Sequence, residues 1–213
     1  MNTPLLLTER NGLWVVSKPS GWVVHRTNDP TIPDLLSWAK ETFPDVSNIE
    51  QIAPIHRIDR ATSGLVLLSP DPEIRANLGH CFANEGIKKE YRALVYGQTS
   101  PTLAINRPLE DRRRGKKLQA RTDAETLETF VSCSYLAVFP QTGRKHQIRR
   151  HLQAINHAVV GEKRYKPKKF LPVPGFPGRL WLHAHRITLP DGETFEAPLS
   201  SELEAQLQLL RSL

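Results

Sequence analysis

The sequence has few cysteines, no long apolar runs and no secretory signal, and each shortage excludes a class of protein. Cys81 and Cys133 are its only cysteines, too few and too far apart for a disulfide framework or a CxxC motif. Apolar runs such as Leu65 to Leu68 are far too short to span a bilayer. The N-terminus, Met1-Asn2-Thr3-Pro4, lacks a basic segment and a cleavage site. We therefore expect a cytoplasmic protein with no membrane contact.

Length and composition fit one globular domain. Hydrophobic residues make up 39% of the 213 residues and charged residues 24%, which is ordinary for a folded protein. There is no internal repeat, low-complexity tract or obvious linker. We expect a single catalytic domain over residues 1–213, without an S4-type RNA-binding domain, that acts as a monomer.

The net charge of +7 is concentrated in two blocks. Residues 107–121 hold seven basic side chains against two acidic ones. Residues 144–186 hold eleven basic side chains, and Glu162 is the only acid among them. Clustered Lys and Arg side chains bind polyanions by neutralising phosphates and releasing counterions, although a basic block is also common on a solvated face.

Periodicity and turn residues predict a mixture of strands and helices. Strands are predicted at residues 12–17, 90–96, 135–139 and 180–189, and helices from Leu35, from Pro72 to Gly86, at 145–156 and at 201–213. Thr31 with Asp34 forms a capping-box pattern before the first helix. Asp71 is the expected N-cap of the second helix, and Gly86 is expected to close it. The pattern favours an α+β fold with a mixed, mostly antiparallel sheet and flanking helices.

The most unusual segment is 53–68, where Asp59 lies between basic residues. His56, Arg57 and Arg60 surround this acid, and a Thr-Ser-Gly turn and an apolar strand follow it. A carboxylate flanked by cations stays ionised, as a nucleophile must. The alternative from these residues alone is an aspartate in a surface salt bridge.

Segment 56–64, His-Arg-Ile-Asp-Arg-Ala-Thr-Ser-Gly, resembles the HRLDxxTSG signature of the RluA-type pseudouridine synthases. Four other segments resemble motifs of the same family in the same order. They are the KPxG turn at 18–21, the KxYxAxVxG strand within 87–97, the TGRxHQIRxHL helix at 142–152 and the LHA strand at 182–184. Residues 156–162 depart from the family's GHPxxGD motif, with Ala158 for Pro and Glu162 for Asp.

The resemblance implies the pseudouridine synthase fold, with a central cleft, and isomerisation of uridine to pseudouridine in RNA. Asp59 would be the nucleophile, Tyr91 would stack on the base, and Arg149 would pair with Asp59. Segments 18–26 and 142–152 are most similar to the TruC-type enzymes, which modify a T-stem uridine of tRNA. Ribosomal RNA is the alternative target. RNA contacts are expected from basic side chains near the nucleophile and in the basic blocks: His56, Arg57, Arg60, Arg112, Arg113, Arg114, Lys116, Lys117, Arg144, Lys145 and Arg150.

Two other functions are weighed against this one. A non-catalytic RNA-binding protein would have no need of Asp59, Tyr91 and Arg149. A basic hydrolase or nuclease would require a metal ion. However, His146 and His151 are five residues apart, and His183 and His185 lack a third ligand at metal-binding spacing. We therefore expect neither a metal nor a cofactor.

Overall fold

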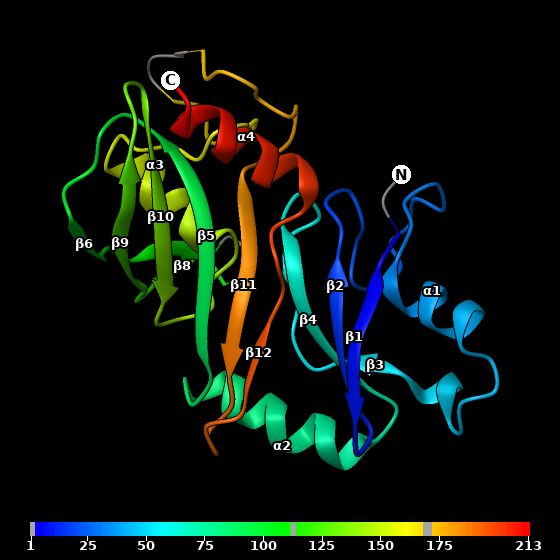
Figure 1. The fold of residues 1–213 in the computed structure, drawn as a ribbon. Helices are drawn as coiled ribbons and strands as arrows, with labels where there is room; N and C mark the ends of the chain where they lie inside the picture. Colours follow the sequence, from blue (N-terminus) through cyan, green and yellow to red (C-terminus); the bar gives the residue numbers. More distant parts are fainter. Residues whose placement is uncertain (1–2, 112–113, 168–171) are drawn as a thin grey trace. The chain divides into compact units, whose positions relative to one another are not determined.

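The computed structural model describes residues 3–111, 114–167 and 172–213 and divides into two compact units (Figure 1). The first unit contains the chain up to Ile87 together with Ala184–Pro198, and the second contains Lys88–His183 and Leu199–Leu213. The chain thus passes between the units three times. No helix in the described ranges is long and apolar enough to cross a membrane. The single catalytic domain stays a prediction.

The first unit is a sheet with two helices. Its strands are β1 (Leu5–Arg10), β2 (Leu13–Lys18), β3 (Ala53–Pro54), β4 (Ser63–Ser69), β11 (Leu182–Thr188, from Ala184 onward) and β12 (Thr194–Glu196). Its two α-helices are α1 (Leu35–Thr42) and α2 (Pro72–Ala83), and a short 3₁₀ turn, η1 (Ile49–Gln51), lies between them in the sequence. The strand order is β1-β2-β4-β11, with β3 also paired to β4 and β12 to β11. β2 pairs antiparallel with both β1 and β4.

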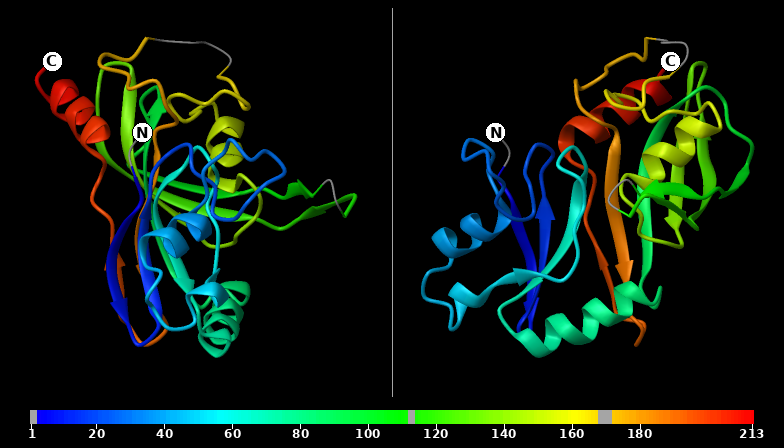
Figure 2. Two further views of the ribbon diagram at one scale, coloured as in Figure 1. Left: turned by 90° about the vertical axis from the view of Figure 1, so that its right-hand side faces the viewer. Right: turned by 180° about the vertical axis from the view of Figure 1, so that it is seen from behind.

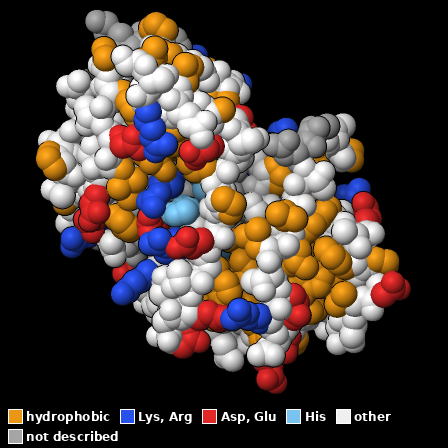
Figure 3. Space-filling view, in the orientation of Figure 1, with side chains coloured by type: hydrophobic (Ala, Val, Ile, Leu, Met, Phe, Trp, Pro, Cys, Tyr) orange, Lys and Arg blue, Asp and Glu red, His pale blue; other side chains and the backbone are white. Residues whose placement is uncertain are grey.

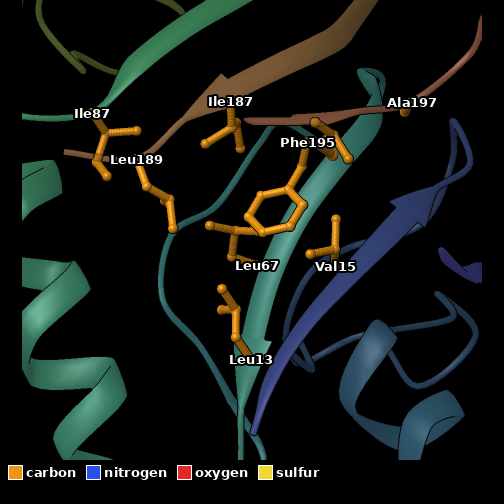
Figure 4. Close-up of a cluster of buried hydrophobic side chains, with 9 residues drawn as sticks. Leu13, Val15, Leu67, Ile87, Ile187, Leu189, Phe195 and Ala197 are labelled. Atoms are coloured by element: carbon orange, nitrogen blue, oxygen red, sulfur yellow. The ribbon is translucent and has the colours of Figure 1, made fainter. Parts of the chain in front are cut away.

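Alternate residues of β2 and β4 build the core of this unit (Figure 4). Leu13 and Val15 point to the same side as Leu67, where they meet Phe195 of β12. Side chains two residues apart lie on one face of a strand, so these residues form one apolar cluster, and the alternate residues Trp14, Val16 and Leu68 are buried on the other face. Ile74, Leu78 and Phe82 of α2 pack against this cluster. The core therefore fixes β4, and with it the end of the segment that carries Asp59.

The second unit is a strongly bent antiparallel sheet with two helices and a hairpin. Its strands are β5 (Lys88–Tyr96), β6 (Thr102–Asn106), β9 (Arg121–Thr129) and β10 (Cys133–Pro140), in the order β5-β10-β9-β6. Among the described residues, β7 (Leu109–Asp111) and β8 (Lys116–Leu118) pair only with each other. The helices are α3 (Gln147–Ala154) and α4 (Ser201–Arg211). The hairpin leaves the sheet beside α3, drawn in green and yellow in Figure 2.

The predicted α+β class and mostly antiparallel sheet are confirmed. The capping-box prediction at the first helix is wrong, and the second helix is closed by Gly86 as predicted, although Gly86 is not its left-handed residue. The N-cap of α1 is Asp34, which accepts hydrogen bonds from the backbone N–H groups of the next turn, and Thr31 instead binds Asp29. Gly86 closes α2 because its N–H donates to Cys81 O at 2.9 Å, and the left-handed residue is Glu85, with φ +62°.

Candidate active site

Asp59 lies in the loop between β3 and β4, and main-chain bonds fix the first half of that loop. The N–H of Ile55 donates to the carbonyl of Leu67 at 2.9 Å. In return the N–H of Leu67 donates to Nε2 of His56 at 3.1 Å, so the histidine ring continues the ladder that β3 begins. The His56 ring also stacks on Phe82 of α2 at 4.4 Å. His56 thus fixes the loop to β4 and α2. Its contact with RNA stays a prediction.

The turn at residues 18–21 holds the second half of the loop. The N–H of Gly21 donates to the carbonyl of Arg60, and Arg60 Nε donates back to the carbonyl of Gly21, at 2.8 and 3.0 Å. Ser20 Oγ donates to the carbonyl of Ala61 at 2.8 Å. Gly21 adopts φ +93°, which glycine reaches without steric cost. The resemblance assigned these two segments to one family, and the structure shows that they bind each other.

Lys18 secures this arrangement from inside. Its side chain is fully buried, and its ammonium donates to three carbonyls, those of Pro19, Trp22 and Arg60. A buried ammonium is costly unless its donors are satisfied, and here main-chain oxygens surround it. Asp59 itself is half-buried between exposed Arg57 and Arg60, and its carbonyl accepts the N–H of Thr62 at 3.1 Å. Hydrogen bonds therefore fix the backbone both before and after Asp59, the candidate nucleophile.

Tyr91 and Arg149 belong to the second unit, whereas Asp59 belongs to the first. Tyr91 is half-buried on β5, opposite Val138 of β10. The predicted salt bridge between Asp59 and Arg149 stays a prediction.

The start of α3 is built from the side chain of Gln147. Its Oε1 accepts from Thr142 Oγ1 at 2.6 Å and from the N–H of Arg144 at 3.0 Å. Its Nε2 donates to the carbonyl of Arg121 and to Thr122 Oγ1, at 2.9 and 3.0 Å. The helix begins two residues later than predicted, because the N-cap His146 has φ +54° and is not helical. Gln147 thus fixes the position from which Arg149 projects.

Arg149 forms a bidentate ion pair with Glu162. Nε and Nη2 donate to the two carboxylate oxygens at 2.6 and 2.8 Å, and both side chains are almost fully buried. Burial raises the pKa of Glu162, but the bonds from Arg149 and from two backbone N–H groups outweigh it and hold that pKa below its usual range. The carboxylate is therefore ionised beside the guanidinium.

The two basic blocks meet within the second unit. Arg144 Nε donates to the carbonyl of Gln119 at 3.0 Å, and Arg150 Nη1 donates to the carbonyl of Glu110 at 3.1 Å. These bonds tie the N-terminal segment of α3, and α3 itself, to the hairpin of β7 and β8, which carries exposed Lys116 and Lys117. The blocks, separate in sequence, thus form one surface. We call Arg144, Lys145, Arg150, Lys116 and Lys117 the basic surface.

The remaining predicted RNA-binding residues have varied surroundings. Arg114 is exposed and lies 3.7 Å from Asp111, and Arg112 and Arg113 lie outside the described residues. On the face drawn in Figure 3, Lys and Arg side chains are interspersed with Asp and Glu side chains, so this face has no continuous basic area. In the described part of the chain no three His, Cys, Asp or Glu side chains are grouped to hold a metal ion.

Solved structures share this fold. The human RNA pseudouridylate synthase domain-containing protein 4 superposes with a TM-score of 0.79 and 21% identity, over 97% of this chain and 92% of that one. The human domain-containing protein 1 gives a TM-score of 0.74 and 22% identity, over 99% and 96%. The chain therefore has the pseudouridine synthase fold.

The family model for RNA pseudouridylate synthase matches residues 12–154, and the chain belongs to this family. Among curated relatives, ribosomal large subunit pseudouridine synthase D of Nitrosomonas europaea is 30% identical over 98% of this chain and 65% of its own length. The tRNA pseudouridine synthase C of Haemophilus ducreyi is 28% identical over 96% of this chain and 93% of its own length. The chain thus spans about two thirds of the first relative and nearly all of the second.

Sequence reasoning missed the roles of Lys18 and Glu162. Lys18 was part of a recognised turn, but nothing in the sequence indicates that its ammonium is buried. Glu162 had one available signal, because it is the only acid in a long basic block. An isolated acid among many cations is a candidate for a specific ion pair, and the structure identifies Arg149 as its partner.

Proposed function

We propose that this protein converts a uridine of a folded RNA to pseudouridine, with Asp59 as the nucleophile. The observation that carries the proposal is the fixed loop around Asp59. Two sets of hydrogen bonds restrict the main chain of this loop. After Asp59 the loop accepts bonds from Lys18, Ser20 and Gly21, and before Asp59 the ring of His56 accepts a bond from β4. Catalytic groups gain most when their positions are set before the substrate arrives.

The reaction needs no external atoms. The Asp59 carboxylate attacks the uridine, at the ribose C1′ or at the base, and the bond between C1′ and N1 breaks. The uracil turns, a bond forms between C1′ and C5, and the carboxylate leaves. C5 loses one proton and N1 gains one, so the product and the substrate are isomers.

Tyr91 and Arg149 are assigned supporting roles. An aromatic ring beside the nucleophile would stack on the base once the base has left the RNA helix, and its hydroxyl would assist the proton transfer. The Arg149 guanidinium would pair with the Asp59 carboxylate and keep it ionised and oriented. Both roles require Tyr91 and Arg149 to reach the uridine that Asp59 attacks.

The proposed substrate is tRNA, at a T-stem uridine, bound by a monomer in the cytoplasm. Support comes from the TruC-like segments 18–26 and 142–152 and from the tRNA pseudouridine synthase among the relatives, which this chain matches over nearly its whole length. The basic surface suits a folded RNA backbone, since A-form RNA is recognised mainly through shape and phosphates. Ribosomal RNA is the second candidate, because another relative is named for the large ribosomal subunit.

Tritium release from 5-tritiated uridine tests this function directly. Wild-type protein should release tritium from tRNA, and Asp59→Ala should release none while its RNA affinity and thermal unfolding stay close to wild type. Asp45→Ala, which removes an exposed acid of the same unit, is the matched control and should be fully active. Product from Asp59→Ala at the wild-type rate would refute the nucleophile. RNA binding without any product from the wild type would favour a non-catalytic RNA-binding protein.

A further inference from the structure

Arg149 is held at its edge and over its face by residues of the loop that follows α3. At the edge, Glu162 takes Nε and Nη2 in a bidentate pair. Over the face, the ring of Tyr165 lies 5.5 Å from the guanidinium carbon. Bidentate pairing fixes the plane of a guanidinium, and an aromatic ring against its face restricts it further.

Glu162 is itself held by the loop that it organises. Its Oε1 accepts the backbone N–H groups of Arg164 and Tyr165 at 2.7 and 3.2 Å, in addition to Arg149. The hydroxyl of Tyr165 lies 2.9 Å from Nδ1 of His146, the N-cap residue of α3. The contacts thus link His146 to Tyr165, and Tyr165 to both Glu162 and Arg149. Within this group, Glu162 and Tyr165 contact the guanidinium.

We propose that Glu162 is a positioning residue for Arg149 in the isomerisation, an inference that rests on the proposed function. Glu162 occupies two of the five N–H donors of Arg149 and thereby sets the direction of the others, those on Nη1 and the second on Nη2. It acts through Arg149 and does not touch the uridine.

The carboxylate must have this length as well as this charge. The backbone of the loop from Gly161 is fixed by close packing, because a Cβ atom on Gly161 would lie 2.2 Å from the carbonyl of Arg179. A shorter acid at position 162 therefore cannot approach Arg149 by moving the loop. Glu162→Asp would withdraw the carboxylate by about one C–C bond length, roughly 1.5 Å, and Glu162→Gln would keep the length but lose the charge.

Single-turnover and steady-state kinetics with the tRNA substrate test the role. Glu162→Gln should lower kcat by about 100-fold with little change in KM, the scale expected when a catalytic group is misplaced by about 1 Å. Glu162→Asp should recover part of that loss. The control is Glu202→Gln, which removes the acid from the ion pair with Arg179 in the same unit. It should lower the thermal unfolding temperature without slowing the reaction.

A double-mutant cycle separates positioning from stability. Arg149→Met alone leaves Glu162 without its ion-pair partner, whereas Arg149→Met with Glu162→Gln removes both charges and should fold at least as well. On the Arg149→Met background, Glu162→Gln should cause no further loss of kcat. The inference would be overturned, and the proposed function would stand, if Glu162→Gln lowered kcat in the Arg149→Met background as much as it does in wild type. The same holds if wild type is active and the Glu162→Gln variant has the same kcat. Wild-type protein inactive on both tRNA and rRNA would overturn the proposed function as well.

Discussion

The backbone of Gly64 lies against the backbone of Ala184 so closely that a Cβ atom on Gly64 would be 2.1 Å from the carbonyl oxygen of Ala184. Gly64 closes the Thr-Ser-Gly turn after Asp59, and Ala184 belongs to the late Leu-His-Ala segment of β11. Gly64 also has φ +107°, where other residues are strained. The Thr-Ser-Gly and Leu-His-Ala motifs, whose residues Gly64 and Ala184 are 120 positions apart, thus contact each other through their backbones.

Gly64→Ala should destabilise the protein by about 3 kcal/mol, because the backbone strain adds to a steric clash that no side chain can relieve. Urea unfolding measures the loss. Gly192→Ala is the control, since Gly192 has φ +91° but nothing lies within 4 Å of its Cβ position. This substitution should lower the free energy of unfolding only by the backbone strain, about 1 kcal/mol. Equal losses for the two variants would show that the contact with Ala184 is unimportant.

The sequence predicts the elements that carry strong periodicity or clear caps. The helix from Pro72 has an Asp N-cap followed by proline, and the structure confirms both. Several strands were missed, the nine-residue β9 among them. β6 has one buried residue and β8 has none, so their sequences lack the alternation that marks a strand.

Within the candidate site, the motif residues could be predicted, but their partners could not. Glu162 binds Arg149 across thirteen positions and a non-helical loop, and no spacing rule predicts such a contact. Lys18 reaches the carbonyl of Arg60 across 42 positions. Both contacts depend on how the chain returns on itself, which local patterns do not encode.

His151 links α3 to the rest of the second unit through a buried chain of hydrogen bonds. Its Nε2 lies 2.9 Å from the carbonyl of Arg107, which can only accept, so Nε2 carries the proton. In the neutral ring Nδ1 then accepts from Thr122 Oγ1 at 2.9 Å. Burial lowers the pKa of His151, the charges of Arg150 and Arg107 act in the same direction, and the bond to the Arg107 carbonyl opposes them.

The free energy of unfolding should therefore fall at mildly acidic pH. The lowered folded-state pKa means that the unfolded chain binds the proton more readily, so His151 stabilises the protein above about pH 6.5 and loses this effect as pH falls through the folded-state value. Each unit of pKa difference is worth about 1.4 kcal/mol. Urea unfolding at pH 8 and pH 5 should show a larger loss for wild type than for His151→Gln. Exposed His25→Gln should behave like wild type, and the same pH dependence in all three proteins would contradict the assignment.

Tyr91→Phe should bind RNA with wild-type affinity but slow the isomerisation by about 100-fold, the lower range for loss of a proton-transfer group. The ring that stacks on the base remains, and only the hydroxyl is removed. Tyr135→Phe is the control, because Tyr135 lies buried on β10 against Trp181 in the same unit. Wild-type turnover in Tyr91→Phe would remove the hydroxyl from the chemistry and leave the stacking role.

The basic surface should determine affinity for RNA without selecting the uridine. Phosphate contacts position a protein on a nucleic acid but carry no sequence information. Lys116→Glu should therefore weaken tRNA binding, while the modified uridine stays the same. It should also reduce the log–log slope of affinity against salt by roughly 0.7 to 0.9 for each phosphate that the protein no longer neutralises. The control is Lys40→Glu, which breaks an ion pair with exposed Glu50 in the first unit and should leave binding unchanged.

Modification of tRNA and of rRNA fragments, measured side by side over a salt series, completes this test. Product from tRNA that declines steeply with salt is the expected result. Product from rRNA alone would refute the tRNA substrate while the synthase activity stands. A flat salt response, or equal affinity of wild type and Lys116→Glu, would show that RNA does not bind the hairpin of β7 and β8. The joining of the two basic blocks by Arg144 and Arg150 would then serve only to hold α3 in place.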